Sequence, residues 1–106
     1  MDREALEDLF SGVGPISIRR MFGGNGIYSD GMIFALELRG ELMLKGDDEA
    51  GPLYEEAGAR RWRYTHRTSG KDVAMPYWSL PESALDDSDE MTHWARIAIA
   101  AARRSR

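Results

Sequence analysis

The sequence of 106 residues contains no cysteine. That absence excludes disulfide frameworks, thiolate zinc sites, iron–sulfur clusters and catalytic thiols. Long apolar runs are also missing, since none approaches the ~20 residues of a membrane-spanning helix. The charged N-terminus, residues 1–4, has no apolar segment of the kind found in secretory signals. We therefore expect a cytoplasmic protein that makes no membrane contact.

Basic residues are in deficit, with 14 lysines and arginines against 18 acidic residues and a formal net charge of −4. Strong, purely electrostatic binding of nucleic acid would need a local basic patch to overcome this average. Hydrophobic residues make up 42% of the chain and charged residues 30%, which is the balance of a globular protein. The length fits one domain, which we expect to span residues 1–106.

Helical periodicity appears at both ends of the chain. Near the N-terminus it gives the apolar stripe Leu6, Leu9, Phe10 and Val13. The last helix is expected to begin near Asp87, with acids at its start and arginines at its end, as the helix dipole favours. Its apolar stripe consists of Met91, Trp94, Ala95, Ala98, Ile99 and Ala102.

A shorter helix is expected between the acids at 47–49 and Gly58, with Leu53, Tyr54 and Ala57 facing inward. Acidic pairs at 47–48 and 86–87 each lie at an expected helix start. Negative charge stabilises that end of a helix by ~0.3–1 kcal/mol, so neither pair needs a catalytic explanation.

Between these helices the sequence reads as strands joined by tight turns. The turn signal at 30–31, Asp-Gly, places Tyr28 opposite Ile33 and Ile27 opposite Phe34. A three-residue loop at 39–41 would follow, and it would set the leucines of two strands on one face. A two-residue loop at 39–40 is the alternative, but it would turn Leu42 and Leu44 to the opposite face, so the leucine pattern favours the longer loop.

The Ser-Gly pair at 69–70 indicates another hairpin, with Tyr64 opposite Met75 and Trp62 opposite Tyr77. We therefore expect an α+β domain of two layers, in which helices cover one face of an antiparallel sheet. The expected order of elements is α-β-β-β-α-β-β-α.

The glycine-rich segment at 21–26 has neither the lysine of a phosphate-binding loop nor the position of a dinucleotide fingerprint, so we interpret it as a sharp bend or bulge. The two histidines, His66 and His93, have no partner set for catalysis or metal binding, and we interpret them as structural. We expect no catalytic residue, no metal and no cofactor.

A basic hairpin offers a possible nucleic-acid surface. Strand alternation puts Arg61, Arg63, Arg67 and Trp78 on one face, and Lys71, next to the turn at 69–70, is the fifth candidate. The same alternation sends Trp62 and Tyr64 to the other face, away from the arginines. An ordinary solvated face is the alternative interpretation.

An apolar surface on the side of the first sheet away from the helices is a candidate protein interface. Its members are Phe22, Tyr28, Ile33 and Met43, flanked by Arg19 and Arg20. The alternative is that another part of the chain covers this face.

An ordered set of motifs resembles the TfoX N-terminal domain, the first domain of the TfoX/Sxy regulators of bacterial competence genes. The motifs are RRMFGGNGIY at 19–28, DG at 30–31, FAL at 34–36, LMLK at 42–45 and MPY at 75–77. The resemblance implies an antiparallel α+β domain similar in layout to type III secretion chaperones, without catalytic residues. The family-motif positions, which it implies are structural or interface positions, are Arg20, Met21, Phe22, Gly23, Gly26, Lys45 and Tyr77.

Together these observations predict a non-enzymatic regulatory domain that acts through a protein partner or by self-association. The alternative is weak nucleic-acid binding through the arginine-rich hairpin.

Overall fold

The computed structural model describes residues 1–21 and 23–106, and in these ranges it contains three α-helices and one six-stranded antiparallel sheet. The elements are α1 (Arg3–Leu9), β1 (Ser17–Met21), β2 (Gly24–Ser29), β3 (Met32–Leu38), β4 (Glu41–Lys45), α2 (Ala50–Glu56), β5 (Arg61–Thr65), β6 (Asp72–Ser79) and α3 (Ser88–Arg104). Short 3-10 helices follow α1 (Ser11–Val13) and precede α3 (Glu82–Leu85). No helix within these ranges has both the length and the apolar character that crossing a bilayer demands.

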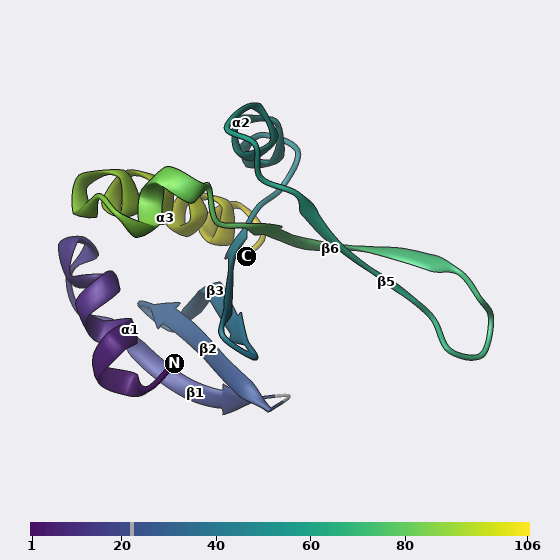
Figure 1. Ribbon diagram of the computed structural model, residues 1–106, viewed down its shortest axis with the longest axis horizontal. Coiled ribbons are helices and arrows are strands. Elements are labelled where there is room, and N and C mark those ends of the chain that lie inside the picture. Colours follow the sequence, from purple (N-terminus) through teal and green to yellow (C-terminus); the bar gives the residue numbers. More distant parts are fainter. Residues whose placement is uncertain (22) are drawn as a thin grey trace.

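The α+β fold is confirmed, with one strand more than expected before α2. The additional strand is β1, which pairs with β2 from Ser17 opposite Tyr28 to Met21 opposite Gly24. The strands lie in the order β1-β2-β3-β4-β6-β5. Helix α3 packs against β3 and β4, while the β5–β6 hairpin extends away from the body (Figure 1).

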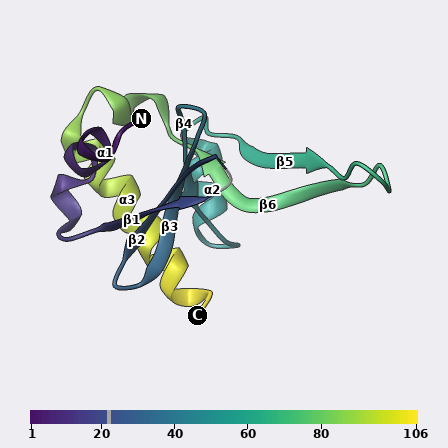
Figure 2. The ribbon, with the colours of Figure 1, turned by 90° about the horizontal axis from the view of Figure 1, so that it is seen from below.

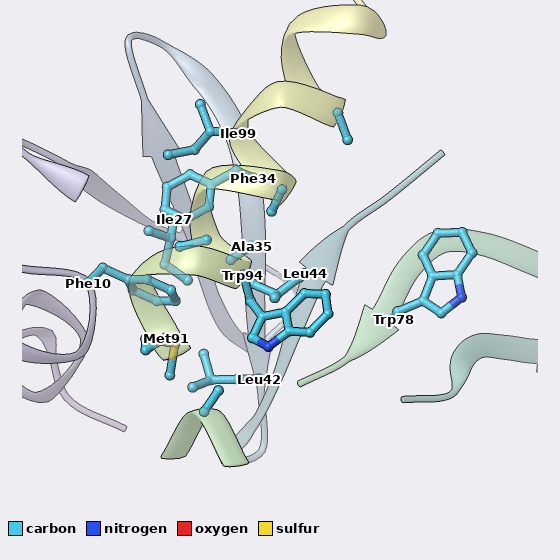
Figure 3. Close-up of a cluster of buried hydrophobic side chains, with 14 of the residues drawn as sticks. Phe10, Ile27, Phe34, Ala35, Leu42, Leu44, Trp78, Met91, Trp94 and Ile99 are labelled. Carbon is cyan, nitrogen blue, oxygen red and sulfur yellow. The ribbon is translucent and has the colours of Figure 1, made fainter. Parts of the chain in front are cut away.

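The main hydrophobic core lies between the sheet and the helices (Figure 3). Phe10 meets Phe34 edge to face, with ring centroids 5.3 Å apart. The apolar stripe expected for the last helix is confirmed, because all six of its residues are buried. Asp87 caps this helix as expected, since its carboxylate accepts hydrogen bonds from the amides of Asp89 and Glu90.

The β2–β3 turn at 30–31 is confirmed, and both of its residues have the positive φ that this type of turn requires. Tyr28 lies opposite Ile33 as expected. The predicted pairing of Ile27 with Phe34 is wrong, because a β-bulge next to Ile27 shifts its partner to Ala35.

The three-residue loop predicted between β3 and β4 is also wrong. The observed loop has two residues, Arg39 and Gly40, which have φ values of 53° and 84°. This register puts Leu36 opposite Met43 and turns Glu37 toward the helix side. Glu37 stays there because its carboxylate accepts hydrogen bonds from the Asn25 side chain and from the Gly40 amide.

The β5–β6 hairpin closes with a longer loop than expected. The amide of His66 donates to the carbonyl of Lys71, and this places Tyr64 opposite Val73 rather than Met75. A bulge between Arg61 and Arg63 then brings Arg61 opposite Trp78. Because the register differs by an even number of residues, the two faces of the hairpin keep the expected side chains.

Helix α2 buries Tyr54, as expected, between the rings of Trp78 and Trp94. The Tyr54 hydroxyl donates to the carbonyl of Lys45. Leu53 and Ala57 do not face inward, and Leu53 is 46% exposed. Only one side of this short helix meets the body, and Ala50, Gly51 and Tyr54 occupy that side, which leaves Leu53 and Ala57 outside it.

Candidate protein interface

The face of the sheet away from the helices carries a second apolar cluster. Its buried centre consists of Leu36, Met43 and Tyr77, and half-buried residues surround it: Met21, Ile33, Leu38, Trp62 and Met75. All eight residues come from strands. We call this surface, together with Tyr28, the helix-free face.

The predicted interface residues differ in how far the structure exposes them. Tyr28 and Ile33 lie opposite each other and are half-buried on the helix-free face. Met43 is only 6% exposed, so the expectation that it forms part of a bare surface is wrong. Neighbouring side chains of the same cluster close over it. Phe22 lies outside the described residues.

The two flanking arginines point to opposite sides of the sheet. The Arg19 guanidinium lies 5.3 Å from the centre of the Tyr28 ring, on the helix-free face. Arg20 lies opposite Asn25 and lines a cavity on the other side with Glu37. The prediction that both flank one surface is therefore wrong, because successive side chains of a strand alternate between faces.

A second cation rests on the helix-free face. The Lys45 ammonium lies 5.4 Å from the centre of the Tyr77 ring. Burial raises the pKa of the Tyr77 hydroxyl, and the nearby Tyr28 raises it further, so this phenol stays neutral at physiological pH. The face therefore presents apolar and aromatic groups with positive charge at its rim.

A hollow of about 800 Å³ opens at the end of this face, next to the start of β4. We call it the arginine hollow. Its apolar lining includes Leu42, Met43, Trp62, Leu80 and Leu85. Its charged lining consists of three arginines, Arg60, Arg61 and Arg63, and one carboxylate residue, Glu41. Sequence reasoning noticed the arginines but missed the hollow, because the hollow depends on where β6 leaves β4.

The nucleic-acid candidates do not form one exposed patch. Trp78 is 3% exposed, which contradicts its expected place on an open face. The Arg61 guanidinium lies 4.6 Å from the centre of the Trp78 ring, and the indole N–H of Trp78 donates to the Glu55 carboxylate. A base therefore has no free face of the Trp78 ring on which to stack.

Between Pro76 and the tip of the hairpin, β5 and β6 pair only with each other. We call residues 63–75 the hairpin arm. Figure 2 shows it extending from the body. Arg67 and Lys71 are exposed near its tip, and the Arg63 guanidinium lies 3.8 Å from the Asp72 carboxylate.

Both histidines are exposed rather than packed within the core. His66 lies at the arm tip, and the His93 ring lies edge-on to Trp94 with centroids 5.0 Å apart. In the described parts of the chain, no three histidine or carboxylate side chains gather in a way that could hold a metal ion.

The arrangement of these elements can be compared with known proteins. A family model for the TfoX N-terminal domain matches residues 8–102, nearly the whole chain. The chain belongs to this family. The TfoX family is a regulatory family linked to competence and is not a known class of enzyme.

A curated TfoX relative is the DNA transformation protein TfoX1 of Aliivibrio fischeri (strain ATCC 700601 / ES114), which is 32% identical over 90 residues. The match covers 80% of this chain and 43% of that protein. The chain thus spans less than half the length of this relative.

Most of the TfoX motif positions lie around the β1–β2 hairpin and the helix-free face. Met21 belongs to the second apolar cluster, and Gly26 lies directly beneath it, since a Cβ there would come 2.9 Å from the Met21 sulfur. Lys45 and Tyr77 form the cation–ring pair described above. Gly23 has a φ of 76°, in agreement with the sharp bend expected for this segment.

Proposed function

We propose that this chain is a non-enzymatic regulatory domain of the competence type, which acts by binding another protein through the helix-free face. The observation that carries the proposal is the second apolar cluster, built by strands and left without a helical cover. A contiguous apolar surface of this kind on a small domain is typical of a protein-binding site.

The composition of the face supports a protein partner. Aromatic residues, methionine and arginine are the residue types enriched in protein interfaces. Here tyrosine, methionine and tryptophan occur together, and Arg19 and Lys45 lie over tyrosine rings at the rim. Family membership supports the regulatory role.

The test compares two variants of the full chain. Ile33→Glu places a charge on the half-buried part of the helix-free face, whereas Leu53→Glu places the same charge at an exposed apolar site on α2. Each variant is used as bait in the native host, and circular dichroism verifies that both fold. A regulatory protein that is retained by the wild type and by Leu53→Glu, but lost with Ile33→Glu, supports the proposal. Identical partner sets for all three baits contradict it.

Self-association through the same face is measured separately. Light scattering of the wild type should show a dimer that Ile33→Glu dissociates if the partner is a second copy. A wild-type monomer excludes that form of the proposal and leaves only a different protein as partner.

Nucleic-acid binding is a second candidate function, favoured by the exposed Arg67 and Lys71 on the hairpin arm. It predicts micromolar affinity for DNA or RNA that weakens steeply with added salt. The variant Arg67→Ala/Lys71→Ala should lose that binding. The absence of any gel shift at low salt would exclude this function.

A further inference from the structure

We propose that the arginine hollow binds an extended peptide segment in which acidic and apolar side chains alternate. This inference rests on the proposed function, because it gives the chemistry of a protein partner. It assigns part of the contact to a defined place, at the end of the helix-free face where Met43 and Trp62 belong to both surfaces.

The backbone beside the hollow favours an extended ligand. Strand β4 begins at Glu41, but β6 pairs with it only from Met43 onward. Within the described residues, Glu41 and Leu42 therefore have a strand partner on one side alone, which is β3. A strand edge of this kind binds an added peptide through main-chain hydrogen bonds.

The lining favours apolar side chains along one side of such a peptide. Leu42, Leu80 and Leu85 come from three separate elements or connections and meet around the hollow. Leu85 is 58% exposed, so it offers apolar area that the folded chain does not cover. In an extended peptide every second side chain points to the same side, which matches an apolar lining beside a charged rim.

The charges of the rim favour carboxylates on the other side of the peptide. Arg61 is already engaged, since its Nε donates to the Met75 carbonyl and its guanidinium covers Trp78. Arg63 has only a loose contact with Asp72 at 3.8 Å, and Arg60 has no carboxylate within ion-pair distance among the described residues. Arg60 and Arg63 are therefore the cations that remain to bind acidic side chains, with complementary charge setting specificity.

An acidic peptide fits this site better than nucleic acid does. Base stacking needs an exposed aromatic ring beside the cations that hold the phosphates. Trp78 is buried, and Trp62 packs among the apolar side chains of the second cluster. Tyr64 is 42% exposed, but its ring lies beside Trp62 with centroids 6.4 Å apart, on the hairpin face away from Arg61 and Arg63. The net charge of −4 also opposes a polyanion over longer distances, whereas a short peptide meets only the local arginines.

The experiment uses the full chain and a fluorescein-labelled peptide of alternating leucine and aspartate, (Leu-Asp)3, with (Leu-Lys)3 and a single-stranded oligothymidylate as comparison probes. Fluorescence anisotropy gives the affinities at two salt concentrations. Backbone amide NMR shifts locate the site. The variants are Arg60→Glu/Arg63→Glu and, as a matched control, Arg103→Glu/Arg106→Glu, whose arginines are exposed at the C-terminal end.

We expect (Leu-Asp)3 to bind and to shift the amides of residues 41–43, 60–63 and 79–80. The Arg60→Glu/Arg63→Glu variant should weaken binding by about tenfold or more, while the control variant stays within about twofold of the wild type. The single variant Arg60→Gln, which removes one charge without reversing it, should give a smaller loss in the same direction.

Three results would overturn the inference. The first is no binding of (Leu-Asp)3 at about 1 mM peptide, a concentration far above the Kd of specific recognition. The others are equal binding of (Leu-Lys)3 and tighter, Arg60-dependent binding of oligothymidylate. Self-association that depends on Arg60 would likewise replace the foreign peptide with a second copy. If the peptide fails while Ile33→Glu still removes a regulatory partner, the inference falls and the proposed function stands. If the peptide binds while Ile33→Glu changes nothing, the hollow acts without the helix-free face.

Discussion

The guanidinium of Arg104 holds the carboxylate of Asp47 in a two-pronged contact, with Nε 2.7 Å from Oδ2 and Nη2 3.0 Å from Oδ1. The same carboxylate accepts hydrogen bonds from the amides of Glu49 and Ala50 at the start of α2. A single side chain therefore caps one helix and ties it to the end of another, 57 positions away in the sequence.

This contact predicts a pH dependence of stability. The hydrogen bonds from Arg104, followed by those from the α2 amides, lower the pKa of Asp47 from its usual 3.8 to about 2. Stability from this carboxylate is therefore fully present above pH 3.8 and is lost as the pH falls toward 2. We expect Arg104→Gln to lower the free energy of unfolding at pH 7 by only a modest amount, because solvent screens this exposed guanidinium, and to flatten the acid limb.

Urea denaturation between about pH 1.5 and about pH 7, which spans the pKa values of Asp47 in the unfolded and folded states, measures both effects. Arg103→Gln is the control, since Arg103 is exposed and makes no ion pair among the described residues. Equal acid limbs for the two variants would contradict the prediction.

The N-cap of α3 gives a second prediction. Asp87→Ala removes an acceptor that two backbone amides use, at 2.9 and 3.2 Å, and should cost about 1 kcal/mol of stability. Asp86→Ala, one residue earlier at an exposed site, removes the same charge without removing a cap and should change stability by less than about 0.5 kcal/mol. Thermal or urea denaturation of the pair separates the cap from the charge, and equal losses would show that the cap is not the cause.

The glycine-rich bend gives a third prediction. At Gly24 an added Cβ would lie 2.0 Å from the backbone carbonyl oxygen of Glu37, which cannot move without breaking the sheet. Gly24→Ala should therefore destabilise the fold by about 3 kcal/mol or more. At Gly26 the nearest atoms are the ends of the Met21, Ile33 and Tyr28 side chains, at 2.9 to 3.1 Å, so Gly26→Ala should cost less. Urea denaturation compares the two, and a larger loss for Gly26→Ala would contradict the argument.

Buried Glu37 gives a fourth prediction. Burial by itself raises the pKa of this carboxyl, but hydrogen bonds from Asn25 and Gly40 outweigh it, and the net pKa lies below 4.5. In Glu37→Gln one of the two donors meets an NH2 group instead of an oxygen, which should cost about 2 kcal/mol. The exposed Glu41→Gln next to the same turn should be nearly neutral. Urea denaturation at pH 7 tests the pair, and similar stabilities would mean that the hydrogen bonds to Glu37 contribute little.

The elements that follow from a local signal with one physical meaning were predicted correctly from the sequence. The helical spacing from Met91 to Ala102 and the Asp-Gly turn at 30–31 each allow only one arrangement, and both are confirmed. The α+β class follows from them, because helices flank a run of strands that are joined by tight turns.

Two of the predicted strand registers are wrong because a single residue changes which residues lie opposite each other. The bulge next to Ile27 and the left-handed Arg39 each move a partner by one position, and alternation cannot reveal them when both faces are apolar. The leucine pattern predicts that the leucines of β3 and β4 share one face, but Leu36 belongs to a second core on the other side of the sheet.

The candidate site was predicted in part for the same reason. Tyr28 and Ile33 were placed on the helix-free side correctly, since their register depends only on the turn at 30–31. The burial of Met43 and Trp78 depends on neighbours from distant strands and from α2, which no local pattern describes. The arginine hollow likewise arises only when β4, β5 and the segment before α3 come together.

The self-paired hairpin arm has a consequence for how this chain can evolve. Its backbone hydrogen bonds are not shared with the core, so residues 63–75 should open and exchange their amide hydrogens while the rest of the protein stays closed. Mutations that lengthen, shorten or recharge this segment without changing Met75, which packs in the second apolar cluster, should then leave the global folding equilibrium almost untouched. Natural selection can thus change the length and charge of the arm without first finding compensating changes in the interior.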